Sequence, residues 1–417
     1  MGELRFGVAG NGLRGGLARH AHNPAMGMSV VAVCDVRPER LDKAREWYGE
    51  ELRTYLEFDE LLEDDDLDAI FVLTPDHLHE EQACKALESG RAVYLEKPMA
   101  ISVEGADRIL ASAARSGSVL YVGHNMRHMN FVVEMKRLID RGEVGQVRAI
   151  WCRHFVGNGG DFYFRDWHAD RRYSNGLLLQ KGSHDIDVIH WLAGGYTAAA
   201  QAFGGSFVYA EGGKRRQSPA PVPSWTSDDL VRHWPPRSLP DLNPVIDVED
   251  LSLVQMQLDN GVLATYDQCH FTPDYWRNFT VIGDEGRLEN FGDSGPGSCI
   301  RLWNGRCSYD ASGHETVEVA EEKGGHGTAD QRCVEEFVAV LRGDRPSAVN
   351  SSVAARQAVA AACAATASLR SGGGVVRPVP LALELERAFA MSYGETRRGW
   401  PQANRCGGYL PPDVAKM

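Results

Sequence analysis

Near its start the chain reads LRFGVAGNGLRGG (residues 4–16). The run opens with a short apolar segment, Leu4–Ala9, that predicts a buried strand. A turn with the spacing Gly10-x-Gly12-x-x-Gly15 follows at once. Glycine at these positions permits a tight turn and lets backbone N–H groups approach a pyrophosphate at the start of the next helix. The stretch therefore predicts the first strand and turn of a dinucleotide-binding fold.

The next apolar run, SVVAVCD at residues 29–35, ends at Asp35. A carboxylate at the end of the second strand can accept the ribose hydroxyls of a dinucleotide and repels a 2′-phosphate. We therefore expect NAD(H) to be preferred over NADP(H). Arg37 and Arg40 lie close enough in sequence to weaken that preference.

Strand-like and helix-like segments alternate over residues 1–124. Apolar strands separated by helices pair in parallel, with helices on both faces of the sheet. We therefore predict an α/β domain with a doubly wound parallel sheet, a Rossmann domain, over this range. The expected strands are 4–9, 29–34, 67–73, 91–95 and 119–122, and the expected helices are 14–22, 38–48, 79–89 and 103–116.

The pattern changes over residues 125–417, where strands follow one another and hairpin signals join them. This predicts an α+β substrate domain built on a largely antiparallel open sheet. Residues 205–247 are rich in Gly, Pro and Ser and read as an irregular insertion. The expected strands are 147–155, 251–258, 262–269 and 279–283, and the expected helices are 131–141, 182–192 and an alanine-rich region over 328–370.

Composition narrows the range of partners. With 57 acidic against 44 basic side chains the formal net charge is −13, which disfavours nucleic acid and anionic lipid. The nine cysteines show no C-x-x-C spacing, so we expect neither a disulfide framework nor a metal site. No signal peptide or membrane-spanning run is evident. These features predict a cytoplasmic protein with reduced thiols.

Polar residues follow the third and fourth strands where each ends. The third runs into Thr74-Pro75-Asp76-His77-Leu78-His79, and the fourth into Glu96-Lys97-Pro98. Carboxyl ends of parallel strands are where such folds bind ligands. A lysine there can lose part of its hydration, which lowers its pKa and lets it hold a substrate hydroxyl or relay a proton. From spacing alone, a surface lysine would explain Lys97 as well.

Taken together, the glycine turn, Thr74-Pro75 and Glu96-Lys97-Pro98 resemble the Gfo/Idh/MocA family, which includes glucose-fructose oxidoreductase and inositol dehydrogenase. The resemblance continues through residues 123–127 (GHNMR) and the spacing Gly182-x-His184-x-x-Asp187. It implies an NAD(H)-dependent oxidoreductase that moves hydride between nicotinamide and a secondary alcohol of a sugar, cyclitol or glycoside. It also implies a homo-oligomer, a dimer or tetramer, because the open sheet often forms the interface in this family.

The resemblance also implies roles for individual residues. Lys97 would lie near the nicotinamide and the substrate, and His184 would act as general base or acid, a task suited to the range in which histidine titrates. The residues expected to bind the cofactor are Gly10, Asn11, Gly12, Leu13, Arg14, Asp35, Thr74, Pro75, His77, His79, Glu96, Lys97 and Asn125. The residues expected to bind the substrate are Lys97, Arg127, Lys181, His184 and Asp187.

One departure from the family pattern leaves alternatives open. Dehydrogenases of the family usually carry Asp four residues before the histidine, whereas this chain has Gln180 followed by Lys181. This favours, as one alternative, the family's redox-neutral NAD-dependent glycosidases, and the aromatic segment 271–277 and the run Gly324–Gly327 would also suit a carbohydrate. A second alternative is a non-enzymatic cofactor-binding sensor, but a sensor has no need of Lys97 and His184.

Overall fold

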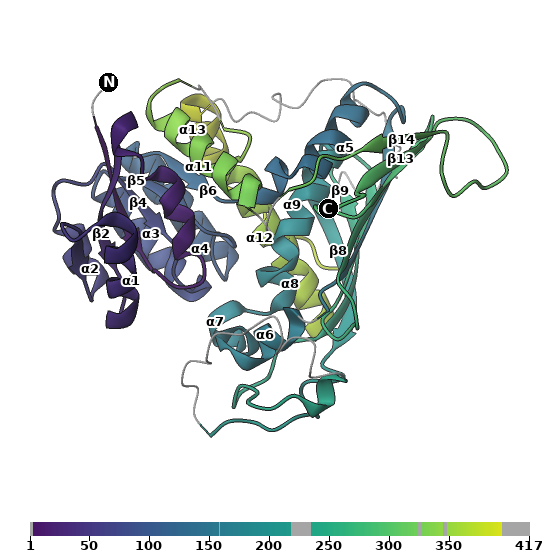
Figure 1. The fold of residues 1–417 in the computed structure, drawn as a ribbon. Helices are drawn as coiled ribbons and strands as arrows, with labels where there is room; N and C mark the ends of the chain where they lie inside the picture. Colours follow the sequence, from purple (N-terminus) through teal and green to yellow (C-terminus); the bar gives the residue numbers. More distant parts are fainter. Residues whose placement is uncertain (1–2, 158, 218–234, 323–326, 345–347, 394–417) are drawn as a thin grey trace. The chain divides into compact units, whose positions relative to one another are not determined.

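A computed structural model of the chain describes residues 3–157, 159–217, 235–322, 327–344 and 348–393 (Figure 1). These residues form two compact units. The first contains the described residues of 1–128, 326–359 and 380–399, and the second contains those of 129–325 and 360–379. The chain therefore leaves the first unit after residue 128 and contributes two later segments to it. No helix in the described ranges is long and apolar enough to cross a membrane.

A six-stranded sheet forms the centre of the first unit. All its neighbouring strands are parallel, in the order β3-β2-β1-β4-β5-β6. This confirms the predicted doubly wound sheet. The strands are β1 (Leu4–Ala9), β2 (Met28–Cys34), β3 (Arg53–Tyr55), β4 (Ala69–Val72), β5 (Ala92–Leu95) and β6 (Leu120–Val122). The three-residue β3 was not expected, because it lacks an apolar run.

The helices of the first unit come from both ends of the chain. From the C-terminal part, α11 packs into the sheet core, where the Phe337 ring lies edge-on to Phe71 and Tyr94 with centroids 5.6 Å away in each case. The helices are α1 (Pro38–Tyr48), α2 (Phe58–Leu62), α3 (His79–Glu88), α4 (Val103–Ser116), α11 (Gly327–Leu341), the first part of α12 (Ser352–Arg370) and α13 (Leu383–Tyr393).

Two helix predictions need correction. The segment expected to be a helix over 14–22 is a 3₁₀ helix, Gly15–Ala21, with bonds such as Leu17 N–H to the Arg14 carbonyl at 2.9 Å. Two adjacent glycines at its start weaken the α-helical alternative. The region 328–370 is not one helix, because α11 ends at Leu341 and α12 begins at Ser352.

The second unit is built on an eight-stranded sheet in the order β14-β13-β12-β11-β7-β10-β9-β8. Only β7 and β10 run parallel, and the other neighbours are antiparallel. The expected open, largely antiparallel sheet is therefore present. Its strands are β7 (Val147–Phe155), β8 (Thr197–Gly205), β9 (Leu251–Leu258), β10 (Leu263–Cys269), β11 (Trp276–Gly283), β12 (Arg287–Phe291), β13 (Cys299–Trp303) and β14 (Glu315–Glu318).

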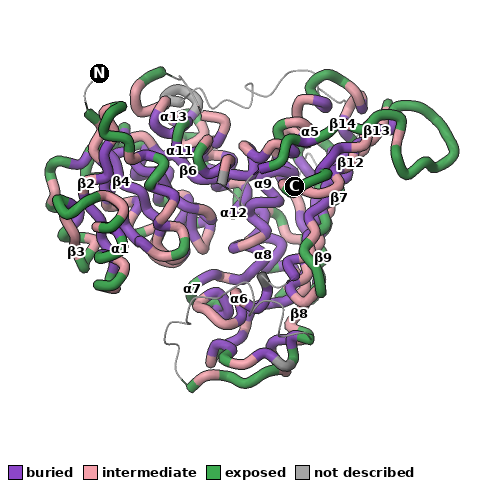
Figure 2. Tube along the Cα trace, viewed as in Figure 1, coloured by how far each residue is buried: buried purple, intermediate pink, exposed green. Residues whose placement is uncertain are grey.

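The two faces of this sheet differ. On one face, alternate residues of β7 such as Ile150, Cys152 and His154 are buried, and α9 (Gly182–Ala193) packs against β7 and β10. Figure 2 shows α9 buried along almost its whole length. Helix α5 (Asn130–Asp140) packs farther along, against β12 and β13. The opposite face leaves Trp151 exposed.

The described parts of the 205–247 insertion are packed into the second unit. The buried Asp250 carboxylate accepts the backbone N–H groups of Phe207, Val208 and Tyr209 at 2.8–3.0 Å. The Tyr209 ring stacks on Phe164 of α6 (Gly159–Arg165) with centroids 4.0 Å apart. Residues 218–234 of the insertion, and Gly324–His326 of the glycine-rich run, lie outside the described residues.

Candidate functional site

The glycine turn of the first unit is closely packed against the end of β4. Gly10 has φ +89°, and a Cβ there would lie 2.9 Å from the backbone carbonyl of Leu73, so glycine is required on both counts. Asp35, at the end of β2, is buried and accepts the N–H groups of Asn11 at 2.8 Å and Arg37 at 3.0 Å. The predicted ribose-binding carboxylate is thus held beside the turn.

Arg40 lies over the same turn. Its Nη1 is 3.3 Å from Asp35 Oδ2 and 3.2 Å from where a Cβ would stand on Gly12. Its backbone carbonyl accepts the Asn11 side-chain amide at 2.7 Å. Arg37 instead pairs with Glu39. Of the two arginines near Asp35, Arg40 is therefore the one whose guanidinium contacts the carboxylate.

Arg14 joins the glycine turn to two carboxylates far away in sequence. It makes a bidentate pair with Asp330 of α11 at 2.7 and 2.9 Å and contacts Glu96 Oε1 at 2.7 Å. Burial alone would lower the pKa of Arg14, but the two carboxylates raise it well above its usual value. Asn125 also donates to Asp330, at 2.7 Å. A partly buried cation with two such carboxylate partners is held in one position.

Glu96 in turn orients Lys97. Its second oxygen, Oε2, accepts the Lys97 backbone N–H at 3.0 Å, and Glu96 is buried. Asp76, which follows β4, is also buried, and its Oδ2 has no hydrogen-bond partner among the described residues. Burial raises the pKa of Asp76, the positive charge of Lys97 opposes this, and Glu96 adds to it. Lys97 therefore stands among acidic groups at the carboxyl ends of β4 and β5.

His79 connects the two polar loops at these strand ends. Its Nδ1 lies 2.8 Å from the Pro98 carbonyl and its Nε2 lies 2.9 Å from the Thr74 carbonyl. The ring is fully buried, and burial lowers its pKa. A neutral imidazole has one N–H to donate, so it can serve only one of the two carbonyls at a time. His79 is thus a support for both loops.

Other predicted residues of the first unit have varied settings. Arg127 is buried and donates to the Val349 carbonyl at 2.8 Å. Burial lowers the pKa of His77, which is partly exposed. Leu13 is 83% exposed.

In the second unit, the first turn of α9 carries His184 and Asp185, and both are buried. Asp185 Oδ2 lies 2.9 Å from His154 Nδ1 on β7 and accepts the Tyr266 hydroxyl of β10 at 3.0 Å. Asp185 Oδ1 pairs with Arg277 Nε of β11 at 3.0 Å. One carboxylate therefore binds three neighbouring strands of the sheet to the start of the helix.

The hydrogen bonds assign the proton on His154. Arg277 Nη2 donates toward His154 Nε2 at 3.3 Å, so that nitrogen offers its lone pair and the proton sits on Nδ1, facing Asp185. Burial and the Arg277 charge lower the pKa of His154 to about 4, consistent with a neutral ring. Burial would raise the pKa of Asp185, but Arg277, His154 and Lys181 hold it at about 2.

Lys181 lies at the N-terminal end of α9, three residues before His184, and is partly buried. Burial and the Arg277 charge lower its pKa to about 8. Gln180 is the last residue of α8 (Leu177–Gln180), and Asp187 lies one turn into α9; both are buried. The structure thus brings the predicted substrate residues Lys181, His184 and Asp187 together on one helix start.

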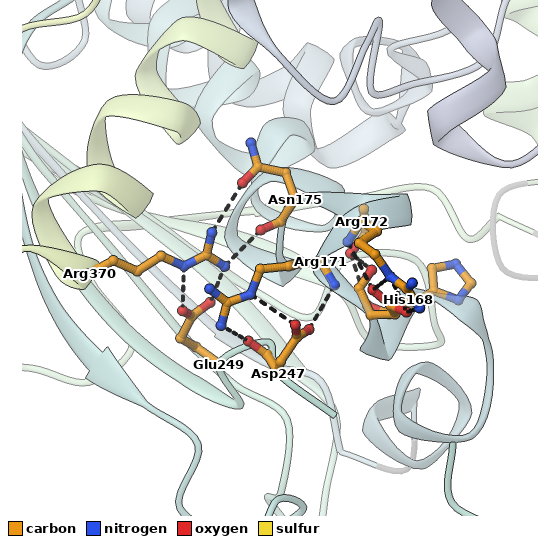
Figure 3. Close-up of polar contacts among 9 residues, drawn as sticks. His168, Arg171, Arg172, Asn175, Asp247, Glu249 and Arg370 are labelled. Carbon is orange, nitrogen blue, oxygen red and sulfur yellow. Dashed lines mark hydrogen bonds and ion pairs between the residues drawn. The ribbon is translucent and has the colours of Figure 1, made fainter. Parts of the chain in front are cut away.

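A set of ion pairs holds the turn before α8 (Figure 3). Arg370 pairs with Glu249 at 2.8 and 3.0 Å and donates to the Asn175 carbonyl at 2.7 Å. Asn175 and Gly176 both have positive φ, and a Cβ on Gly176 would lie 3.0 Å from Arg370 Nη2. Arg171, from the polar segment 167–172, pairs with Asp247. These contacts fix the start of the helices that carry Lys181 and His184.

Sequence reasoning missed several members of both clusters. Asp330 is 316 residues away from its partner Arg14, and nothing local marks it. His154 and Arg277 did leave a signal, because each is polar at a buried position that alternates along its strand with buried apolar residues. The remaining missed residues are Asp76, Asp185 and Tyr266.

The chain matches two family models. Residues 4–124 match the model described as an oxidoreductase family with an NAD-binding Rossmann fold, and residues 132–289 match the GFO/IDH/MocA C-terminal domain. Inositol 2-dehydrogenase of Salmonella typhimurium is 28% identical over 191 residues, 45% of this chain and 54% of that protein. The Klebsiella pneumoniae enzyme of the same name is 30% identical over 192 residues, 46% and 54%. The chain thus matches about half the length of these curated relatives.

Solved structures share the fold. Aldose-aldose oxidoreductase from Caulobacter crescentus superimposes with a TM-score of 0.67 at 21% identity, covering 90% of this chain and 99% of that chain. Myo-inositol 2-dehydrogenase from Lactobacillus plantarum gives 0.67 at 20%, covering 90% and 100%. An oxidoreductase domain protein from Kribbella flavida gives 0.72 at 19%, covering 91% and 100%.

Replacing His79 tests its support of the two loops. His79→Ala removes a buried partner of the Thr74 and Pro98 carbonyls, so we expect unfolding to become easier by about 1–3 kcal/mol and NADH to bind more weakly. Chemical denaturation and NADH fluorescence titration measure the two effects. His20→Ala, at an exposed ring, is the matched control. Equal NADH affinity in the His79 variant and the wild type would contradict the assignment.

Proposed function

Because the chain belongs to the Gfo/Idh/MocA family of oxidoreductases, we propose that it is an NAD(H)-dependent dehydrogenase of a sugar, cyclitol or glycoside. The reaction takes hydride from a secondary alcohol carbon to the nicotinamide, while the hydroxyl proton passes to a protein base. The inositol dehydrogenases among the relatives support a polyol substrate.

The observation that carries the proposal is the setting of Lys97. Two ends of one carboxylate are engaged: Glu96 Oε1 by Arg14 and Oε2 by the Lys97 backbone. The hydrogen bond from its backbone N–H therefore holds Lys97 at the carboxyl edge of the nucleotide-binding sheet. Ligands bind at this edge in such folds. A sensor that only bound the cofactor would need no such arrangement. Lys97 is proposed to hold the reacting hydroxyl, with nicotinamide supplying the hydride acceptor.

The second unit is proposed to supply proton transfer and substrate contacts. His184 and Asp187 are carried on α9, whose first turn is tied to the sheet by Asp185. A firmly held helix suits this role because small displacements of catalytic groups cost large factors in rate. Lys181, His184 and Asp187 are the proposed substrate-facing residues of this unit.

A screen of sugars, cyclitols and aryl glycosides tests the function. We expect at least one free polyol to reduce NAD, followed by the absorbance of NADH, and Lys97→Met to lower kcat/KM by about 10²-fold or more. NADH should still bind to that variant. Lys43→Met, at an exposed lysine on α1, serves as the control.

The glycosidase alternative gives a different outcome in the same screen. Gln180, an amide where the dehydrogenases carry a carboxylate, is the observation in its favour. Release of the aryl group from glycosides with no net NADH, and no oxidation of free polyols, would replace the dehydrogenase proposal with a redox-neutral one.

Cofactor preference follows from Asp35 and Arg40. We propose that NAD(H) binds more tightly than NADP(H), because the Asp35 carboxylate repels a 2′-phosphate. Asp35→Asn keeps an acceptor for the Asn11 N–H but removes the charge, so we expect the preference to fall about tenfold, or about 1.4 kcal/mol. Arg40→Ala should increase the preference for NAD(H) over NADP(H). Fluorescence titrations with NADH and NADPH decide; tighter NADPH binding by the wild type would refute the preference.

The exposed face of the eight-stranded sheet is proposed to form a homo-oligomer interface. Four large apolar side chains lie exposed on its strands: Trp151, Phe203, Leu253 and Leu263. Burying such side chains favours association. Trp151→Glu should shift the protein toward monomers in analytical ultracentrifugation, whereas Tyr309→Glu, at an exposed aromatic outside the strands, should not. A wild type that is monomeric at micromolar concentration would rule out this interface.

A further inference from the structure

Lys181 differs from the paired lysines of the chain in its surroundings. It is partly buried, yet no hydrogen bond or ion pair to its ammonium group occurs within the described ranges. Its Nζ lies over an aromatic face, 5.8 Å from the centre of the Tyr163 ring. By contrast, Lys85 contacts both Asp59 and Glu81 at 2.8 Å, and Lys136 pairs with Asp140.

An ammonium group that is partly buried without an ion pair is costly to keep charged, because burial removes hydration and no anion replaces it. Such a lysine shifts readily toward its neutral amine, which is a base. Strongly perturbed groups of this kind gather at functional sites more often than elsewhere. The absence of an ion pair at Lys181 among the described residues therefore favours a functional role over a stabilising one.

Groups from several elements set the charge around Lys181. The Arg277 guanidinium on β11 opposes protonation, while Asp185 on α9 and Asp293 after β12 favour it, and burial is the largest influence. His154 on β7 and His270 after β10 are kept neutral by burial, which lowers the pKa of each. The balance places the pKa of Lys181 at about 8. Both protonation states are then accessible near neutral pH.

We propose that Lys181 is the base that takes the substrate hydroxyl proton in this chain. The assignment rests on the proposed dehydrogenase function and deepens it. In the oxidation, the carbon–hydrogen bond breaks and its electron pair leaves as hydride to the nicotinamide. The hydroxyl oxygen–hydrogen bond breaks, its proton binds the neutral Nζ of Lys181, and the oxygen electrons form the carbonyl. In the reverse reaction the ammonium returns that proton.

The replacement of the family's carboxylate by Gln180 fits this assignment. An amide cannot offset positive charge on His184 as a carboxylate would. Lys181 follows Gln180 in the sequence and lies at the start of α9, the helix that carries His184. Lys181 can therefore take the proton instead of His184. His184 then positions the hydroxyl without having to become charged.

The pH dependence of polyol oxidation tests the proposal. A base must be neutral to act, so kcat/KM should rise through about pH 8 and then level off. This rise is the rising limb of the pH profile. Lys181→Met and Lys181→Arg should each lose the rising limb and lower kcat/KM by at least about 10²-fold, because methionine has no amine and arginine does not deprotonate. Lys85→Met is the control and should keep the wild-type profile. Survival of the limb in an active Lys181→Met would overturn the assignment while the dehydrogenase function stood.

Changing the charge of Asp293 tests whether Lys181 is the titrating group. A purely structural role of Lys181 would leave the pH profile of kcat/KM unchanged. Asp293 favours the protonated form of Lys181, and Asp293→Asn removes that charge while keeping an acceptor for the Tyr275 hydroxyl. The rising limb should move to lower pH. An unmoved limb in a folded, active Asp293→Asn would count against Lys181 as the titrating group.

Amine labelling measures Lys181 without turnover. The wild type is treated with acetic anhydride across pH 6–11, and the modified peptides are quantified by mass spectrometry. Lys181 should be half reactive near pH 8, well below Lys85, whose pKa is raised by its bonds to Asp59 and Glu81. Equal titration of the two lysines would overturn the proposal. If no polyol were oxidised at all, the dehydrogenase function would fall, and this role with it, even with Lys181 titrating near pH 8.

Discussion

The carboxylate of Glu96 contacts a different partner with each of its two oxygens, and much of the nucleotide-binding unit depends on these two contacts. One oxygen meets the Arg14 guanidinium and the other receives the Lys97 backbone N–H. Since Arg14 also holds Asp330 in a bidentate pair, the glycine turn, the end of β5 and α11 become one connected group. A buried charge without these partners would cost several kcal/mol, so each element keeps the others in place.

Asp185 has the corresponding part in the second unit. Its two oxygens reach His154, Tyr266 and Arg277 on three adjacent strands. Burial and the Arg277 charge keep His154 neutral, and the Arg277 charge is the main influence that keeps Asp185 ionised. The same Arg277 charge lowers the pKa of Lys181. The charges of a structural ion pair thereby influence the protonation of Lys181, which forms no hydrogen bond or ion pair with either partner in the described part of the chain.

The sequence predicted most of what local pattern can encode. The predicted strands 4–9 and 147–155 match β1 and β7 in both bounds, and the predicted helix 38–48 matches α1. The Rossmann class followed from the glycine turn and Asp35. Long-range partners were beyond reach: Asp330 sits in an ordinary helix, and its pairing with Arg14 depends on how the chain returns to the first unit. The 3₁₀ helix Gly15–Ala21 was missed because its pattern resembles that of an α-helix.

The return of α11 to the first unit also affects how the protein is made. Phe337 fills the core of a sheet whose last strand ends at Val122, and Asp330 completes the Arg14 pairing. On a ribosome, more than two hundred residues separate that sheet from the helix that covers it. During synthesis, the apolar surface of the first sheet that packs against Phe337 therefore remains uncovered until the second sheet and α11 have been made. In a chimera that exchanged only the N-terminal 124 residues with a relative, the strands of this core would come from one protein and α11 from the other, so the two parts would not have evolved to pack together.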